Sequence, residues 1–171
     1  MKSAIFAGSF DPPTIGHVDI LNRSLKIFDK VFIPILKNPE KKTFFSEQER
    51  QAFLTKIANE IDPKRIEVHC FNGLLVEFAK KVGTSNVVRG IRDSKDLSYE
   101  LDMYNINRYL FSEIETIFLP TKPENASVSS MAVRQVMSFG GNISGLVPEC
   151  IRYDIENKIK VGGKINESKS K

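Results

Sequence analysis

Cysteine is scarce in this chain of 171 residues, which contains only Cys70 and Cys150. Two cysteines are too few for a disulfide framework, and they are not spaced as a CxxC pair that could hold a metal. We therefore interpret them as plain thiols of a cytoplasmic protein. Internal repeats and linkers are also absent from the sequence, and its length fits one compact domain.

Long hydrophobic runs are missing as well. No segment approaches the roughly 18 consecutive apolar residues that a membrane-spanning helix needs. The apolar stretch within MKSAIFAGSFDPP is shorter than that of a signal peptide. The sequence therefore predicts a protein that does not enter a membrane.

Tryptophan is absent and no RNP, KH or zinc-finger pattern occurs, although a net charge of +4 and a pI near 9.0 suggest an acidic partner. Residues 151–171 hold six Lys or Arg and three Asp or Glu, so they carry three of the four net positive charges. A nucleic-acid-binding module would instead need clustered basic residues with interleaved aromatic side chains. A tRNA synthetase fragment would need a tRNA-binding domain, for which this length leaves no room. We therefore expect phosphorylated small molecules, and not nucleic acid, as partners.

Short apolar runs alternate with amphipathic segments along the chain. The predicted strands are residues 3–8, 31–36, 66–71, 86–89 and 115–119, and Pro34 suggests that the second lies at a sheet edge or ends early. The predicted helices are 17–28, one opened by a capping box of Ser46 and Glu49, one at about 75–82, one capped by Ser94, 130–139 and 149–159. Such alternation requires crossover connections and predicts a single-domain, Rossmann-like, doubly wound α/β fold, with a five-stranded parallel sheet and a C-terminal helix. We assign residues 1–161 to this domain and 162–171, rich in Gly, Ser and Lys, to a disordered tail.

The first predicted strand leads into residues 8–17, GSFDPPTIGH. Ligands of doubly wound sheets bind beyond the carboxyl ends of the strands, and Gly16 at a helix start lets backbone amides approach an anion such as phosphate. His17 adds a side-chain donor at the same place, which suits the stabilisation of a transferring phosphoryl group. The alternative is that Gly16 is only a turn residue and His17 faces solvent. The loop is neither a GxGxxG fingerprint nor a P-loop.

This loop resembles the first signature of the nucleotidyltransferase superfamily. Further strings follow the other strands: KK at 41–42, FNGLL at 71–75, RGIR at 89–92 and SVSS at 127–130. In this order they resemble the bacterial phosphopantetheine adenylyltransferase family over residues 3–155. The resemblance implies transfer of the adenylyl group of ATP to 4′-phosphopantetheine, giving dephospho-coenzyme A and pyrophosphate, by direct in-line attack and with Mg²⁺. The alternative within this chemistry is a sibling that acts on another phosphate, such as a nicotinate-mononucleotide adenylyltransferase or a cytidylyltransferase.

The resemblance also implies roles for single residues. His17 and Lys41 would be catalytic, His17 by stabilising the transition state. Lys41 and Arg89 would hold the acceptor phosphate, Ser9 would lie between the phosphates of both substrates, and Leu75 would line the pantetheine arm. ATP would be bound by Ser9, Phe10, His17, Gly90, Ile91, Arg92, Glu100, Asn125, Ala126, Ser127, Val128, Ser129, Ser130 and Met131.

Several of these residues have plainer interpretations. Leu75 fits the apolar face of a helix, Glu100 fits the surface of another, and Arg92 fits a surface pair with one of the aspartates that follow it. Ser129 and Ser130 stand where a helix begins, so their hydroxyl groups suit N-capping as well as binding pyrophosphate.

The chain departs from the family pattern at three positions. Ser9 stands where threonine is common, Asn125 where an aromatic residue is frequent, and Met131 where the family has a third serine. Mg²⁺ would travel with the ATP phosphates, because no residue cluster has metal-ligand spacing. The resemblance further implies a homohexamer, a dimer of trimers, and coenzyme A as a feedback ligand.

Overall fold

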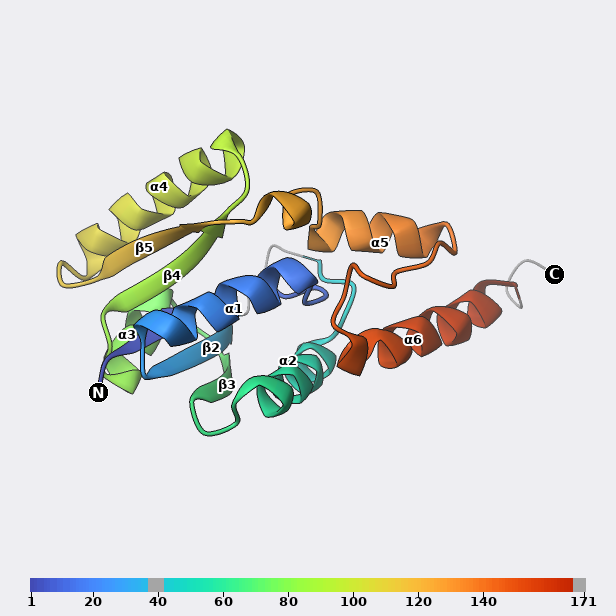
Figure 1. Ribbon diagram of the computed structural model, residues 1–171, viewed down its shortest axis with the longest axis horizontal. Helices are drawn as coiled ribbons and strands as arrows, with labels where there is room; N and C mark the ends of the chain where they lie inside the picture. The colour runs from blue at the N-terminus through green and yellow to red at the C-terminus, as the bar shows by residue number, and fades with distance from the viewer. Residues whose placement is uncertain (37–41, 168–171) are drawn as a thin grey trace.

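The computed structural model describes residues 1–36 and 42–167, with side chains up to Lys158 in the last helix. Five parallel strands form one sheet in the order β3-β2-β1-β4-β5 (Figure 1). Their bounds are Ser3–Phe6 (β1), Lys30–Leu36 (β2), Ile66–Phe71 (β3), Asn86–Ile91 (β4) and Glu115–Pro120 (β5). The chain first builds the β3 side of the sheet and then crosses to β4, so the carboxyl ends of β1 and β4 are neighbours where the strand order reverses. The predicted doubly wound fold is confirmed.

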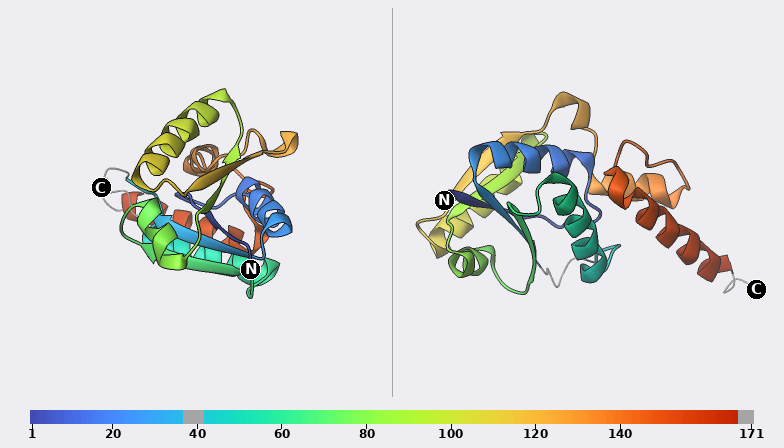
Figure 2. Two further views of the ribbon diagram at one scale, coloured as in Figure 1. Left: turned by 90° about the vertical axis from the view of Figure 1, so that its left-hand side faces the viewer. Right: turned by 60° about the horizontal axis from the view of Figure 1, so that its bottom comes forward.

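Helices cover both faces of this sheet and extend beyond one end. Their bounds are Ile15–Ile27 (α1), Glu47–Ile61 (α2), Leu75–Val82 (α3), Ser94–Leu110 (α4), Pro123–Asn125 (the 3-10 helix η1), Ser130–Ser138 (α5) and Glu149–Glu167 (α6). α1 and α2 lie on one face, and α3 and α4 on the other (Figure 2). α5 and α6 lie beyond the carboxyl ends of the strands (Figure 1). An ion pair between Lys56 and Asp154, at 2.6 Å, joins α2 to α6.

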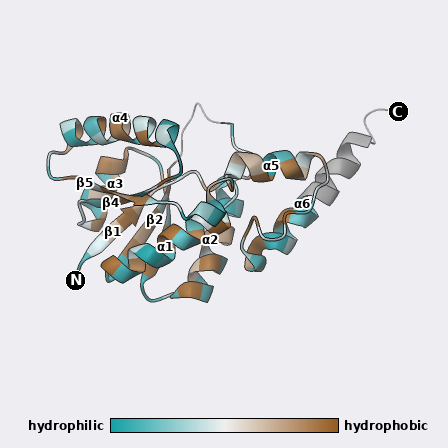
Figure 3. Cartoon of the chain, turned by 45° about the horizontal axis from the view of Figure 1, so that its top comes forward, coloured by the Kyte–Doolittle hydropathy of each residue, from teal (hydrophilic) through white to brown (hydrophobic). Residues whose placement is uncertain are grey.

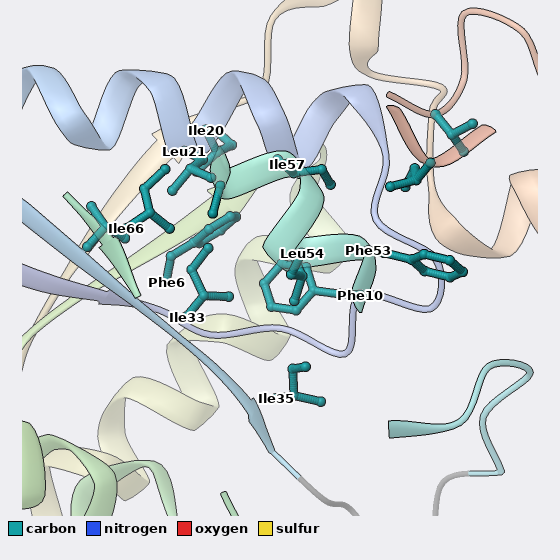
Figure 4. Close-up of a cluster of buried hydrophobic side chains, with 14 of the residues drawn as sticks. Phe6, Phe10, Ile20, Leu21, Ile33, Ile35, Phe53, Leu54, Ile57 and Ile66 are labelled. Carbon is teal, nitrogen blue, oxygen red and sulfur yellow. The ribbon is translucent and has the colours of Figure 1, made fainter. Parts of the chain in front are cut away.

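The apolar core has one part on each face of the sheet. The larger part packs α1 and α2 against β1 and β2 and includes Phe6, Leu21, Ile33, Phe53 and Ile57 (Figure 4). The smaller part lies under α3 and includes Ile5, Phe32, Val76, Phe78 and Val87. Successive residues of β1 thus enter different clusters, so this strand is buried on both faces, as a central parallel strand requires.

Pro34 does not place its strand at an edge. β2 lies between β1 and β3 and pairs with β3 as far as Leu36↔Phe71. The Val31 amide donates to the Arg65 carbonyl on the β3 side, and because amides alternate along a strand, the Pro34 nitrogen faces β1. The continuous ladder between β2 and β1 ends at Ile5↔Phe32, and beyond the proline an isolated bridge joins Gly8 to Ile35. Pro34 is therefore accommodated inside the sheet, because the residue without an amide donor lies where the ladder between β1 and β2 is interrupted.

Two helix starts test the capping predictions. The Ser46 amide donates to Glu49 Oε2 at 2.7 Å and the Glu49 amide donates to Ser46 Oγ at 3.3 Å, so the capping box is confirmed. The prediction of Ser94 as a cap is wrong. Asp93 is the N-cap of α4, and its Oδ1 accepts the amides at positions 95 and 96, both at 2.9 Å. A carboxylate suits this place because its charge also favours the positive end of the helix dipole.

The long helix α4 leaves its apolar side chains largely uncovered. Leu97, Leu101 and Leu110 are 38%, 42% and 43% exposed, and Ile106 and Tyr109 are exposed further. Figure 3 shows hydrophobic residues interspersed with polar ones along this helix. The expected apolar face of this helix exists in sequence, but in the single chain it does not pack onto the sheet as the faces of α1 and α2 do.

α6 continues past its predicted end at Ile159 and reaches Glu167. Residues 162–167, which the sequence assigned to a disordered tail, thus belong to α6. Residues 168–171 lie outside the described residues, so for them the assignment stays a prediction. Cys70 and Cys150 are both free. Burial, aided by hydrogen bonds to glutamates, raises the pKa of each thiol to about 11, which makes both inert at neutral pH.

Gly8 is required by the packing of Phe10, whose ring is fully buried. A Cβ at Gly8 would lie 2.9 Å from Phe10 Cζ, whereas one at Gly16 would meet nothing closer than 3.6 Å. We therefore expect Gly8→Ala to destabilise the fold by about 1–3 kcal/mol, as overpacking does in other cores. Gly16→Ala is the matched control, and its melting temperature should equal or exceed that of the wild type because alanine favours the helix. Thermal melts of both variants test this, and equal melting temperatures would contradict it.

Candidate active site

The reversal of strand order brings together three residues that the sequence predicts to handle phosphate. His17 lies in the first turn of α1, after the loop of residues 7–14 that follows β1 (the β1 loop), while Arg89 lies in β4 and Arg92 directly after it. The charges of Arg92 and Arg89 both act on the His17 ring. The place is the one at which doubly wound sheets bind their ligands.

His17 is held as a neutral hydrogen-bond donor. Its Nδ1 accepts the Thr14 amide at 3.0 Å and lies 2.8 Å from the Thr14 hydroxyl oxygen, so the ring proton is on Nε2. The ring also packs edge-on against buried Phe10, with centroids 5.1 Å apart. Burial, then the charges of Arg92 and Arg89, lower the pKa of His17 to about 4. Nε2–H can therefore donate to a developing negative charge without the ring gaining a proton.

This state of His17 predicts a titration. We expect its ring to titrate at a pKa of about 4, compared with an ordinary value of 6.5. Because the folded-state pKa is the lower one, the unfolded chain binds the proton more readily between these values, and stability falls as the pH drops from about 6.5 towards about 4. Proton NMR of the histidine Cε1–H signals measures this, with His17→Gln to assign the signal. A midpoint near the ordinary value would contradict the burial of the ring.

Arg89 is anchored by a neighbouring carboxylate and a carbonyl. Its Nε donates to Glu100 Oε2 at 2.7 Å, a terminal nitrogen donates to Glu100 Oε1, and the other donates to the Ala7 carbonyl. The side chains of Arg89 and Glu100 are 23% and 12% exposed. Glu100 is therefore not the plain surface carboxylate that the sequence allowed. It fixes the guanidinium, whose two remaining N–H bonds stay available for another acceptor.

Arg92 pairs with Asp96 one helical turn later. Its Nε donates to Asp96 Oδ2 at 2.7 Å and NH2 donates to Oδ1 at 3.0 Å. This hydrogen-bonded pair raises the pKa of Arg92. The surface pair with a following aspartate, which the sequence left open, is thus present, and the charge of Arg92 still acts on His17.

The β1 loop is held in place through its carbonyl groups. Arg50 of α2 donates to the Ser9 carbonyl at 2.7 Å and Ser130 of α5 donates through its hydroxyl group to the Pro12 carbonyl at 2.8 Å. Arg134 of α5 donates to the Asp11 carbonyl. With Arg89 on Ala7, four side chains from three elements bind successive parts of one loop. The loop is therefore preorganised before any ligand arrives.

Sequence reasoning missed Asp11, Arg50 and Arg134. Arg50 could have been found, because it occupies the same helical face as Phe53, Leu54 and Ile57 and is only 5% exposed. A charge on an apolar stripe indicates a buried polar contact. Arg134 carried no such signal, because its partner lies far away in sequence.

Comparison with known proteins identifies the family. Residues 5–136 match the model of the cytidylyltransferase-like family. The chain is 43% identical over 159 residues to the phosphopantetheine adenylyltransferase of Clostridium novyi (strain NT), covering 93% of this chain and 98% of that one. It is 42% identical over 160 residues to the phosphopantetheine adenylyltransferase of Caldanaerobacter subterraneus subsp. tengcongensis, covering 94% and 99%. The chain belongs to the phosphopantetheine adenylyltransferase family.

A solved structure supports the fold of this phosphopantetheine adenylyltransferase family member. Plasmodium falciparum nicotinic acid mononucleotide adenylyltransferase, complexed with NaAD, matches with a TM-score of 0.66 and 17% identity, covering 92% of this chain and 96% of that one. The likeness at this identity concerns the fold alone. The predicted recognition and the prediction of an enzyme of the nucleotidyltransferase class are confirmed by the curated relatives.

The positions that the phosphopantetheine adenylyltransferase family predicts for ATP take different places around the site. Phe10 is fully buried as a whole residue, and its ring packs edge-on against His17. A Cβ at Gly90 would lie 3.0 Å from Ile20 Cγ1, which shows that Gly90 also permits close packing of β4 on α1. The Ile91 carbonyl accepts the Thr121 amide at 2.8 Å.

The predicted ATP-binding residues after β5, 125–131, run from the end of η1 through a loop to the start of α5. Ser129 is the N-cap of α5, and its hydroxyl group accepts the Ala132 amide at 3.0 Å. Capping is therefore present at Ser129, whereas the Ser130 hydroxyl group holds the β1 loop. Asn125 and Val128 are buried, whereas Ala126 and Ser127 between them are exposed. Met131 is 70% exposed.

Two of the residues predicted to bind the acceptor, Ser9 and Leu75, are half-buried next to core side chains. Lys41 lies outside the described residues. Leu75 begins α3, is half-buried and packs against the smaller core cluster. Ser9 is half-buried in the β1 loop, next to the fully buried Phe10. Among the described residues, no helix combines the length and apolar character needed to cross a membrane.

Proposed function

We propose that this chain transfers the adenylyl group of ATP to 4′-phosphopantetheine, forming dephospho-coenzyme A and pyrophosphate. The observation that carries the proposal is the neutral His17 donor flanked by Arg89 and Arg92 at the reversal of strand order. It occurs in a chain 43% identical to a phosphopantetheine adenylyltransferase across nearly its whole length. Phosphoryl-type transfer needs positioned donors and cations more than it needs a covalent nucleophile.

In the proposed reaction an oxygen of the acceptor phosphate attacks the α-phosphorus of ATP in line. The new P–O bond forms as the bond to the bridging oxygen breaks, and the electron pair leaves with pyrophosphate. His17 Nε2–H donates to an α-phosphate oxygen as charge develops there. Arg89 supplies its free N–H bonds to the acceptor phosphate, and Lys41 and Ser9 are proposed to hold the same group.

The nucleotide is proposed to bind as its magnesium complex. Mg²⁺ commonly reaches such sites on substrate phosphates and keeps several waters. Arg92 and the start of α5 at Ser129 and Ser130 are proposed to bind the β- and γ-phosphates, since helix N-termini favour anions. Leu75 is proposed to line the pantetheine arm. Coenzyme A, which shares that arm, is proposed as a feedback ligand.

The chain is further proposed to assemble as a homohexamer in the cytoplasm. The uncovered apolar side chains of α4, among them Leu97, Leu101 and Ile106, support an assembly because exposed apolar groups of this extent favour contact with another surface. Analytical ultracentrifugation tests this, and a 19.3 kDa species at working concentrations would rule the assembly out.

The activity is tested by incubating the protein with MgATP and 4′-phosphopantetheine. Release of pyrophosphate together with the mass of dephospho-coenzyme A is the expected result. Parallel reactions contain nicotinate mononucleotide with ATP, and glycerol phosphate with CTP. Turnover in either of these, and none with phosphopantetheine, would assign the chain to a sibling activity.

A further inference from the structure

Asp11 is a buried carboxylate that joins two segments distant in sequence. It is 2% exposed. Its Oδ2 accepts the Phe44 amide at 2.9 Å, and its Oδ1 accepts the Phe45 amide at 2.8 Å. Both oxygens of the β1 loop's only carboxylate thus accept hydrogen bonds from the backbone that precedes α2, and not from a helix start or a surface lysine.

The far ends of this bridge are fixed independently. Phe45 is fully buried and packs edge-on against Phe53 of α2, with centroids 5.2 Å apart. Arg134 of α5 donates to the Asp11 carbonyl and lies 3.3 Å from Asp11 Oδ2. Figure 1 shows the described segment that leads into α2 passing near the start of α1 and α5. Asp11 therefore has a fixed position relative to α2 and α5 at once.

The bridge connects two segments of the chain that carry different parts of the proposed site. The β1 loop carries Ser9 and leads to His17 and the nucleotide. Phe44 and Phe45 come three and four positions after Lys41, which is proposed to hold the acceptor phosphate. In-line transfer depends on the relative position of these two groups, and errors of about 1 Å lower such rates about a hundredfold. A link that sets this separation acts on the reaction although it touches neither substrate.

We propose that Asp11, supported by Arg134, is a positioning residue that aligns the acceptor with the nucleotide by clamping the 44–45 backbone to the β1 loop. This rests on the proposed adenylyl transfer. Both carboxylate oxygens act as acceptors in its contacts with the two amides and the guanidinium. An amide at this position keeps one accepting oxygen and brings two N–H bonds to a place lined by donors.

The experiment compares Asp11→Asn with the wild type. The variant should raise the KM for phosphopantetheine about tenfold and lower kcat about tenfold, while the Kd for MgATP changes less than about threefold. Hydrogen exchange at the Phe44 and Phe45 amides should accelerate, because they lose an acceptor. Asp62→Asn is the matched control, since Asp62 also accepts two backbone amides, those of Lys64 and Arg65. It should leave all four quantities unchanged.

Arg134→Met supplies a second route if Asp11→Asn does not fold. It should shift the KM for phosphopantetheine in the same direction by a smaller factor. Wild-type kinetic constants in either folded variant, or an equal loss of MgATP affinity, would overturn the proposal. Failure of the proposed function is distinct from this, because the wild type itself would then not turn over phosphopantetheine. Hydrogen exchange would still test the clamp in that case.

Discussion

Replacing His17 by alanine is expected to lower kcat by about three orders of magnitude, within the range found when a single transition-state donor is removed. The Kd for MgATP should change only a few-fold, because the helix start and the arginines remain. The physical reason is that the Thr14 contact at 3.0 Å presents Nε2–H to the site, and alanine offers no donor there. Single-turnover kinetics and calorimetric ATP binding measure the two quantities.

His17→Gln separates a donor from an acid–base group. The glutamine Nε2 can occupy the place of the imidazole Nε2 and donate without titrating, so this variant should recover part of the activity that alanine loses. The kcat of the wild-type protein should also show no titration near the ordinary histidine pKa, because the His17 ring, with a pKa of about 4, is neutral above that pH. His69→Gln is the control, since His69 lies in β3 at the edge of the sheet. Equal inactivity of the alanine and glutamine variants would indicate a role other than neutral donation.

Replacing Arg89 by alanine is expected to damage stability and turnover together. Loss of the guanidinium leaves Glu100, only 12% exposed in its side chain, without its bidentate partner, and leaves the Ala7 carbonyl without a donor. Breaking a largely buried pair in this way costs about 3–5 kcal/mol. Turnover should fall about a hundredfold or more in addition, since the acceptor phosphate loses a cation. Chemical denaturation and steady-state kinetics measure the two effects.

A double-mutant cycle of Arg89→Ala and Glu100→Gln shows how much of the loss of stability comes from the Arg89–Glu100 pair. If Arg89 acts on stability through Glu100, the double variant should be less destabilised than the sum of the single ones. Arg89→Lys should keep the charge but not the bidentate contact, and should therefore recover turnover only in part. Additive losses of stability across the cycle would show that the Arg89–Glu100 pair contributes nothing of its own.

Local sequence patterns predicted the elements well because their causes are local. The Ile66–Phe71 strand and the Ser46–Glu49 capping box follow from alternation and from contacts three residues apart. One error arose where a distant partner decides: Pro34 is tolerated inside the sheet because the ladder with β1 is interrupted at this residue. The other error was local, because Asp93 caps the helix in place of Ser94 through a charged oxygen that accepts two nearby amides.

The absences with which the sequence began determined the class of molecule. Few cysteines and no long apolar run excluded a disulfide framework and a membrane span. The alternation of strand and helix patterns then predicted an α/β domain, and the ten-residue loop with its companion strings indicated the family. Those features depend on neighbouring residues, so the sequence alone could supply them.

Only the tertiary structure decided how the site is held. Arg50 and Arg134 approach the β1 loop from 41 and 123 positions away, and Asp11 of that loop accepts backbone amides 33 and 34 positions away. The same folding gives His17 its neutral ring. Burial and long-range charge cause these properties, and neither exists until the strands assemble.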